Sequence, residues 1–213
     1  MKKGLVVVGI LSFLLAGCST TGSSAKETDP EVQEISVSLP AELTTLDTTQ
    51  TTDKVTFTVI QHLFEGSYRF DEKSQPVPGL AEEAVISEDG KTYTFKLKEE
   101  AKWSDGQQVQ AADFAYAWKK LVDPKTMGPN AYLLDNVVNS QDIREGKADI
   151  ATIGLETPDE KTFVVHLEQL QPSFLSVVSI GWLAPQRQSY VEEKGKAYGK
   201  TSEDLLYTGP SIL

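Results

Sequence analysis

The sequence predicts a mixed α/β fold, and two patterns carry this prediction. Residues 92–97 alternate polar and apolar side chains after an Asp89-Gly90 turn signal, as a half-buried strand does. Residues 111–121 repeat apolar residues at a spacing of three and four, as an amphipathic helix does. Strands and helices do not alternate regularly in the first half, which favours mixed α+β packing over a doubly wound parallel sheet.

Local signals place the other elements along the chain. Asp53 is a helix N-cap candidate, Pro40 ends the first strand, and Asp123-Pro124 closes the helix at 111–121. The first half predicts a strand at 34–39, a helix from 53 that stops at 65–66, a strand at 67–70, a loop at 76–79, a hairpin at 84–97 and a turn at 103–106. The second half predicts a helix or irregular turns at 133–143, a strand near 162–167, an apolar stretch at 174–182, a helix at 190–198 and a strand at 207–213.

An internal echo links residues 89–97 to residues 159–167, since both read as a turn followed by an alternating strand. The similarity has two explanations, a duplication or the independent recurrence of turn-plus-strand chemistry. Under either explanation we expect the two strands to share one sheet.

An apolar run near the N-terminus ends at Cys18, the only cysteine in the chain. Lys2 and Lys3 precede an apolar stretch at 4–15 that is short for a permanent membrane span, and small residues stand just before the thiol. This pattern predicts a lipoprotein signal at 1–17, with Cys18 as the lipidation site and a lipid anchor on the extracytoplasmic face of the cell membrane. The alternative is an ordinary cleaved signal peptide, with Cys18 incidental.

Composition excludes several classes of function. The formal charge is −11, or −13 once Lys2 and Lys3 leave with the signal, so an acidic surface argues against a nucleic-acid partner. Residues 18–30 are rich in Ser, Thr and Gly and predict a flexible membrane-proximal linker. His62 and His166 lack metal-ligand spacing, and no phosphate loop or nucleophile elbow occurs. We therefore expect no enzyme activity, no metal and no cofactor.

Several spaced motifs resemble one known family. In order, they are Leu46-Asp47, Leu63-Phe64-Glu65-Gly66, Pro78-Gly79-Leu80-Ala81-Glu82, the hairpin at 87–95, Ala101-Lys102-Trp103-Ser104-Asp105-Gly106, and Ala112-Asp113-Phe114 with Tyr116, Ala117 and Trp118. They look like the oligopeptide-binding lipoproteins of ABC importers, the extracellular solute-binding proteins of family 5. Each motif also has a structural task; the Trp103 indole, for example, needs a hydrogen-bond acceptor when it is buried.

The resemblance implies a periplasmic-binding-protein-like fold of type II, with only part of its first lobe. It divides the chain into an incomplete central subdomain at 31–64 and 176–213 and a small β-rich subdomain at 65–175. Relatives are more than twice this length, so we expect the second lobe to be missing and the chain to be truncated. Three residues depart from the family pattern: Ala84, Gln110 and Ser211.

The resemblance also implies a function without chemistry. A monomeric protein would capture oligopeptides, including peptide pheromones, and deliver them to ABC permease subunits in the membrane. Some relatives bind nickel or haem, so the ligand class stays open. The peptide backbone would pair with Thr51, Thr52, Asp53 and Lys54, which otherwise form a plain loop and helix cap. The competing hypothesis is a truncated remnant that binds nothing or acts as a membrane-tethered interaction module.

Overall fold

The computed structural model describes residues 36–210. The predicted signal at 1–17, Cys18, the linker at 18–30 and Ser211 lie outside these residues. The chain divides into two units after Ser38, and the first is described only over Ser36–Ser38, as coil. The strand predicted at 34–39 is wrong over its described part, because residues 36–39 take part in no strand pairing.

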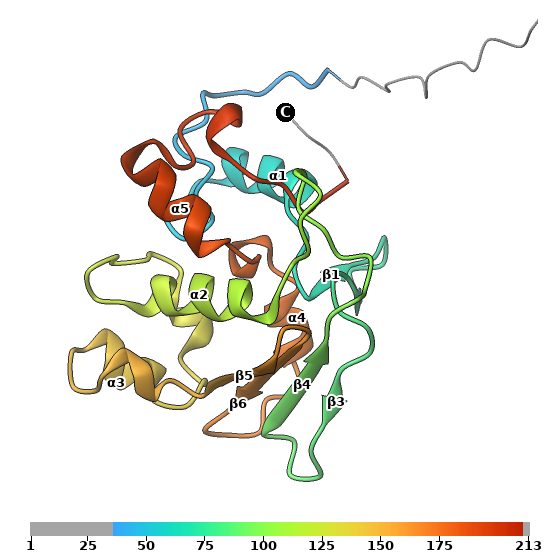
Figure 1. Ribbon diagram of the computed structural model, residues 1–213, viewed down its shortest axis with the longest axis vertical. Helices are drawn as coiled ribbons and strands as arrows, with labels where there is room; N and C mark the ends of the chain where they lie inside the picture. The colour runs from blue at the N-terminus through green and yellow to red at the C-terminus, as the bar shows by residue number, and fades with distance from the viewer. Residues whose placement is uncertain (1–35, 211–213) are drawn as a thin grey trace, which may run out of the picture. The chain divides into compact units, whose positions relative to one another are not determined.

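The unit that begins at Leu39 contains a four-stranded antiparallel sheet in the order β3-β4-β6-β5 (Figure 1). Its strands are β3 (Val85–Ile86), β4 (Thr92–Lys96), β5 (Leu155–Asp159) and β6 (Thr162–His166). β4 pairs directly with β6, so the two predicted turn-plus-strand units do share one sheet. Only Gly90 in the β3–β4 turn has a positive φ, at 68°, which a glycine adopts without steric cost.

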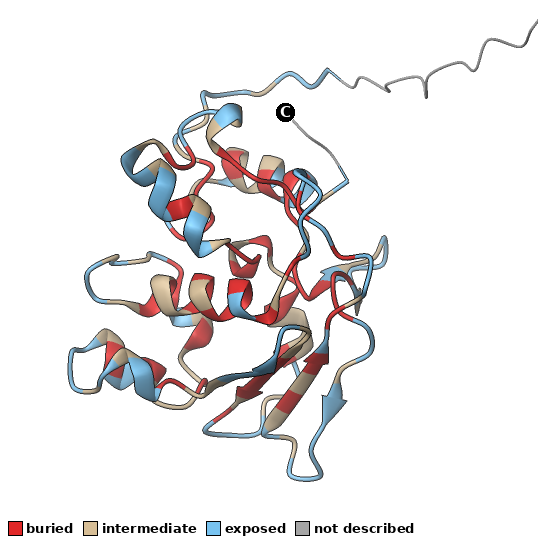
Figure 2. Cartoon of the chain, in the orientation of Figure 1, coloured by how far each residue is buried: buried red, intermediate tan, exposed pale blue. Residues whose placement is uncertain are grey.

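One face of the sheet packs against helix α2 (Ala111–Val122) in the main core. Phe163 of β6 lies 5.6 Å from the Phe114 ring and 5.0 Å from the Trp118 ring, measured between centroids. Tyr93 and Phe95 of β4 point into the same core, as the alternation predicts. Figure 2 shows buried residues on α2 and on the central strands, with exposed residues on β3.

A smaller second core lies around helix α1 (Lys54–Leu63). It consists of Leu46, Ile60, Leu63, Phe64, Ala184, Val191, Tyr198, Leu205 and Tyr207. These residues come from two stretches far apart in sequence, 46–64 and 184–207. The segment before α1 is therefore packed against the end of the described chain.

The remaining elements are short. They are β1 (Tyr68–Phe70), β2 (Pro76–Pro78), α3 (Ser140–Arg144), α4 (Phe174–Val178), α5 (Gln188–Lys194) and the 3-10 helices Ala131–Leu134, Ile150–Thr152, Gly181–Leu183, Gly195–Ala197 and Ser202–Asp204. Within 36–210, no helix has the length and apolarity needed to cross a bilayer.

Two further predictions are wrong. The loop expected at 76–79 contains β2, which pairs with β1 in a separate two-stranded sheet. Proline is tolerated there because an edge strand does not need every N–H in the ladder. The strand expected at 207–213 is not formed over residues 207–210, which are coil and bend. Two hydrogen bonds from the Thr208 and Gly209 amides to the Leu63 carbonyl, at 3.3 and 2.9 Å, hold this stretch against the end of α1.

Candidate functional site

The candidate site is the Thr-rich segment that leads into α1. Asp53 is the N-cap, as predicted, and its Oδ1 accepts a 2.8 Å hydrogen bond from the Thr56 amide. That bond is the main reason why the pKa of Asp53 falls to about 2. The Thr44 hydroxyl also donates to Asp53, at 2.9 Å. An ionised carboxylate at this position fixes where the helix begins.

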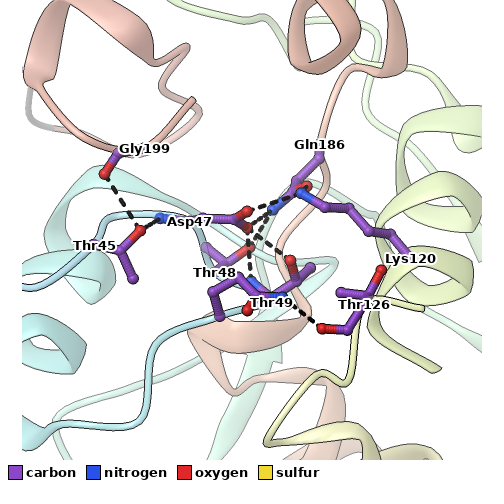
Figure 3. Close-up of polar contacts among 9 residues, drawn as sticks. Thr45, Asp47, Thr48, Thr49, Lys120, Thr126, Gln186 and Gly199 are labelled. Carbon is purple, nitrogen blue, oxygen red and sulfur yellow. Dashed lines mark hydrogen bonds and ion pairs between the residues drawn. The ribbon is translucent and has the colours of Figure 1, made fainter. Parts of the chain in front are cut away.

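Asp47 organises the start of the segment (Figure 3). Its Oδ1 accepts hydrogen bonds from the Thr49 amide at 3.0 Å, from the Thr49 hydroxyl at 2.7 Å and from the Gln186 Nε2 at 2.8 Å. Its Oδ2 accepts from the Lys120 Nζ at 2.9 Å, and the two side chains are only 11% and 18% exposed. The carboxylate is thus buried and fully partnered, as a buried charge must be.

Gln186 joins the same cluster to a third part of the chain. Its side chain is completely buried, accepts from Lys120 at 3.0 Å and donates to the Thr48 hydroxyl at 2.8 Å. Its backbone amide donates to the Asp113 carbonyl at 3.1 Å. Residues 47–49, the last turn of α2 and the segment after residue 183 therefore meet in one polar cluster.

Gly199 lets the chain approach Asp47 closely. Its φ is +75°, and a Cβ at this position would lie 2.5 Å from the Asp47 nitrogen. The Leu46 amide donates to the Gly199 carbonyl at 2.7 Å. The neighbouring Tyr198 is buried, and this burial, with a smaller effect of the Asp47 charge, raises the pKa of its phenol well above the usual value. Lys120 lies over the same ring, 5.1 Å from its centroid.

The far end of the segment has its own anchors. The Thr51 backbone amide donates to the Asp47 carbonyl at 3.2 Å. The side-chain Nδ2 of the buried Asn130 donates to the Thr51 carbonyl at 2.8 Å. Gln50 reaches the Thr126 carbonyl at 3.2 Å. After these bonds, Thr52 is exposed and its N–H and C=O take part in no hydrogen bond within residues 36–210.

The structure places the four predicted contact residues as follows. Thr51, Thr52 and Asp53 form an irregular stretch in which Asp53 has extended backbone angles, whereas Lys54 is the first residue of α1. Thr51 is buried and its backbone is already bonded, so Thr52 alone combines exposure with an open donor and an open acceptor. The sequence did not indicate Lys120, Gln186 or Asn130, because their contacts join segments about 70 or more residues apart.

The Trp-Ser-Asp-Gly motif has a structural task, as predicted. The Trp103 indole donates to Asp113 Oδ2 at 3.1 Å, and the Gln110 backbone N–H donates to the same oxygen at 2.9 Å. Gln110 thus serves as N-cap of α2 although it departs from the family pattern. Burial raises the pKa of Asp113, while these two bonds and the Arg187 charge act against that rise. Arg187 also pairs with Asp105 at 2.7 Å.

The histidines form no catalytic arrangement among the described residues. His62 is exposed on α1. His166 lies 2.9 Å from Glu156 through Nε2 and 3.2 Å from the Thr92 hydroxyl through Nδ1. In the same part of the chain, no three His, Asp or Glu side chains gather closely enough to hold a metal ion.

Comparison with known proteins agrees with the motif pattern. Residues 75–211 match the family model described as "Bacterial extracellular solute-binding proteins, family 5 Middle". The chain belongs to family 5 of the bacterial extracellular solute-binding proteins. It is 36% identical over 207 residues to a dipeptide-binding protein of Lactococcus lactis, covering 97% of this chain and 36% of the relative. It is also 32% identical to the dipeptide-binding protein DppE of Bacillus subtilis, covering 95% and 38%.

Solved structures show the fold of this family 5 chain to be that of type II periplasmic-binding-protein-like proteins. The substrate-binding domain of a Bacillus anthracis oligopeptide ABC transporter matches with a TM-score of 0.78 and 39% identity, covering 79% of this chain and 33% of that one. Listeria monocytogenes OppA bound to peptide matches with a TM-score of 0.76 and 35% identity, covering 78% and 33%. The chain thus spans about a third of the length of the relatives it matches.

Proposed function

We propose that this chain is part of the extracytoplasmic substrate-binding component of a peptide ABC importer, and that it captures peptides through the backbone of Thr52. The single observation that carries the proposal is the open N–H and C=O of this exposed residue, between anchored neighbours. The relatives support the class of ligand, since two are named as dipeptide-binding proteins and Listeria monocytogenes OppA was solved bound to peptide.

Backbone pairing suits a protein that must accept many peptides. An extended peptide that pairs with an exposed backbone gains affinity from main-chain hydrogen bonds, which every sequence can make. Thr52 offers one donor and one acceptor, the set that one residue of an extended peptide needs. Capture of this kind requires no bond to be broken, so the proposal includes neither an enzyme activity nor a cofactor.

The test compares two substitutions at one position. Thr52→Pro removes the backbone donor, whereas Thr52→Ala removes only the side chain. Titration of the chain with tetra-alanine, followed by NMR, should shift the amides of Thr51 and Asp53 in the wild type and in Thr52→Ala, but not in Thr52→Pro. Urea unfolding checks that both variants remain folded. Equal shifts in all three proteins, or no shift in the wild type, would contradict the proposal.

We further propose that residues 31–64 and 176–213 form a central subdomain and residues 65–175 a small one, both within one lobe. The smaller core supports this division, since all its members lie within 31–64 and 176–213, while the main core draws most of its members from 65–175. Since the chain spans about a third of its relatives, we propose that tight capture uses a second lobe as well, and that the closed monomer docks on the permease. The chain alone should therefore bind tetra-alanine weakly. A remnant that binds nothing would give no shift at any concentration.

We propose that Cys18 carries the lipid anchor on the extracytoplasmic face of the membrane. The support is the sequence around it: two lysines, an apolar run and small residues before a lone thiol. Mass spectrometry of the N-terminal peptide from bacterial membranes should find an acylated Cys18. Release of the protein into the soluble fraction in a Cys18→Ser variant is the expected control. An unmodified thiol on a membrane-bound chain would contradict this part of the proposal.

A further inference from the structure

The ion pair between Asp47 and Lys120 lies at the base of the segment that presents Thr52. We propose that Lys120 is a positioning residue for peptide capture, one that holds the segment ready through Asp47 without contacting the peptide itself. The inference rests on the proposed function of Thr52, and it adds a residue that neither the motifs nor the helix pattern indicate.

The first step runs from Lys120 to the backbone. Asp47 receives the Lys120 ammonium on one carboxylate oxygen and both Thr49 donors on the other. The main-chain carbonyl of Asp47 also accepts from the amides of Gln50 at 2.9 Å and Thr51 at 3.2 Å. Hydrogen bonds to Asp47 therefore hold the backbone amides of residues 49–51, and Thr52 is the next residue.

The second step concerns charge. The side-chain partners of Asp47 other than Lys120 are Thr49 and Gln186, which are both neutral, and Asp47 is only 8% exposed. If Lys120 is removed, a nearly buried carboxylate loses its counter-charge, and the cost of an uncompensated buried charge favours its movement toward water. The carboxylate cannot move without breaking its hydrogen bonds with the Thr49 amide and hydroxyl. Thr49 directly precedes Gln50 and Thr51, whose amides bond the Asp47 main chain, so a displaced Thr49 disturbs the turn before Thr52.

The third step links position to binding. A segment that is ordered before the peptide arrives does not have to lose conformational freedom on capture. Buried ion pairs contribute weakly to stability compared with apolar packing, so a pair at this position is better explained by the conformation it imposes. Loss of Lys120 should accordingly weaken peptide binding and loosen residues 49–51 more than the rest of the fold.

The chain offers a matched control. Lys119 lies next to Lys120 in the last turn of α2 and is also half-buried, yet its side chain makes no hydrogen bond or ion pair within residues 36–210. Lys119→Met and Lys120→Met remove the same charge from the same helix end. Lys120→Arg keeps the charge and serves as the conservative variant.

The experiment measures amide hydrogen exchange by NMR in the full chain, together with titration by tetra-alanine. In Lys120→Met, the Thr49 and Thr51 amides should exchange about tenfold faster while β4 and β6 amides keep their rates, and tetra-alanine should bind more weakly. Lys119→Met should behave as the wild type, and Lys120→Arg should restore most of the protection. If Lys120→Met does not fold, Lys120→Gln takes its place under the same criteria.

Three outcomes separate this inference from the proposed function. Unchanged exchange at Thr49 and Thr51, or equally faster exchange at all amides, overturns the positioning role, because a purely structural ion pair would act on the whole fold. Unchanged tetra-alanine binding despite faster exchange also overturns it, while the function of Thr52 stands. If the wild type itself binds no tetra-alanine, the proposed function fails and this inference fails with it.

Discussion

Replacing Trp103 with phenylalanine tests how the buried carboxylate at the start of α2 is stabilised. The Trp103 indole is one of two donors to Asp113 Oδ2, and both residues are buried, at 3% and 7% exposed. Phenylalanine fills most of the same space but has no donor. The substitution therefore removes one charge-assisted hydrogen bond and leaves a small cavity.

The size of the effect follows from these two losses. A hydrogen bond to a charged group contributes about 1.5–3 kcal/mol. The smaller ring costs roughly 1 kcal/mol more, as partial loss of a buried side chain does. We expect Trp103→Phe to lower the free energy of unfolding by about 3 kcal/mol near neutral pH, a large fraction of the stability of a typical domain.

The other two tryptophans are matched controls. The Trp118 indole donates to the neutral Leu183 carbonyl at 2.9 Å. The Trp182 side chain is half-buried, and its buried indole nitrogen has no hydrogen-bond acceptor within residues 36–210. Trp118→Phe should lose a neutral hydrogen bond of about 1 kcal/mol in addition to packing. Trp182→Phe should lose packing alone.

The pH dependence separates the three variants. Burial places the pKa of Asp113 above its ordinary value of 3.8 in the folded protein. Folded protein thus holds this proton to higher pH than the unfolded chain does, so the contribution of Asp113 to stability is present below pH 3.8 and is lost as pH rises through the folded pKa. Removing Trp103 raises the folded pKa further. The deficit of Trp103→Phe should therefore be larger near pH 7 than below the ordinary pKa, whereas the deficits of the other two should not change.

The assay is urea unfolding followed by far-ultraviolet circular dichroism, because tryptophan fluorescence changes with the substitutions themselves. Differences between variant and wild type cancel the other titrating groups. A Trp103→Phe deficit that is the same at both pH values would refute the role of Asp113 as a charged acceptor. A Trp182→Phe deficit as large as that of Trp103→Phe would show that ring size, not the hydrogen bond, decides the effect.

Two further predictions concern the segment before α1. Gly199→Ala should lower the free energy of unfolding by about 1–3 kcal/mol through its backbone angle alone. The clash of the new Cβ, 2.5 Å from the Asp47 nitrogen, should lower it further. Gly146→Ala, at a similar φ of +72° with open space around it, should show only the cost of the backbone angle in urea unfolding. Asp53→Ala should lose about 1 kcal/mol of helix capping. Because the folded pKa of Asp53 is about 2, against an ordinary value of 3.8, the Asp53→Ala deficit should be complete above pH 3.8 and shrink toward pH 2, and a constant deficit would contradict the capping role.

The sequence predicted those parts of the fold that depend on local pattern. The alternation at 92–97 gave the buried face of β4, and the three-and-four spacing gave α2. The sequence also predicts the Asp53 N-cap, because a carboxylate before an apolar helical pattern is a local signal. Each of these features can be predicted from a few residues that are neighbours in the sequence.

The structure departs from the sequence prediction where strand pairing decides which segments form strands. Residues 36–39 alternate like a strand but have no partner strand in the described chain, and strand propensity alone does not form a ladder. β2 forms despite two prolines because β1 lies beside it. The Asp47 cluster was not predicted for the same reason, since an aspartate in a Thr-rich stretch carries no sign of a lysine 73 residues away.

The candidate site consists of an exposed backbone at Thr52 and of the buried residues that anchor the segment around it. These two parts differ in how much of them the sequence can predict. The contact proposed for Thr52 uses backbone groups that almost every residue type carries, so such a contact leaves little trace in residue identity. The information lies in the residues that shape the segment: Asp47, Gly199 and Asn130 each meet a steric or hydrogen-bonding requirement that few residues satisfy. A search for function in this chain should therefore look for the anchors of an exposed backbone, and substitutions there should affect capture more than substitutions of the Thr52 side chain.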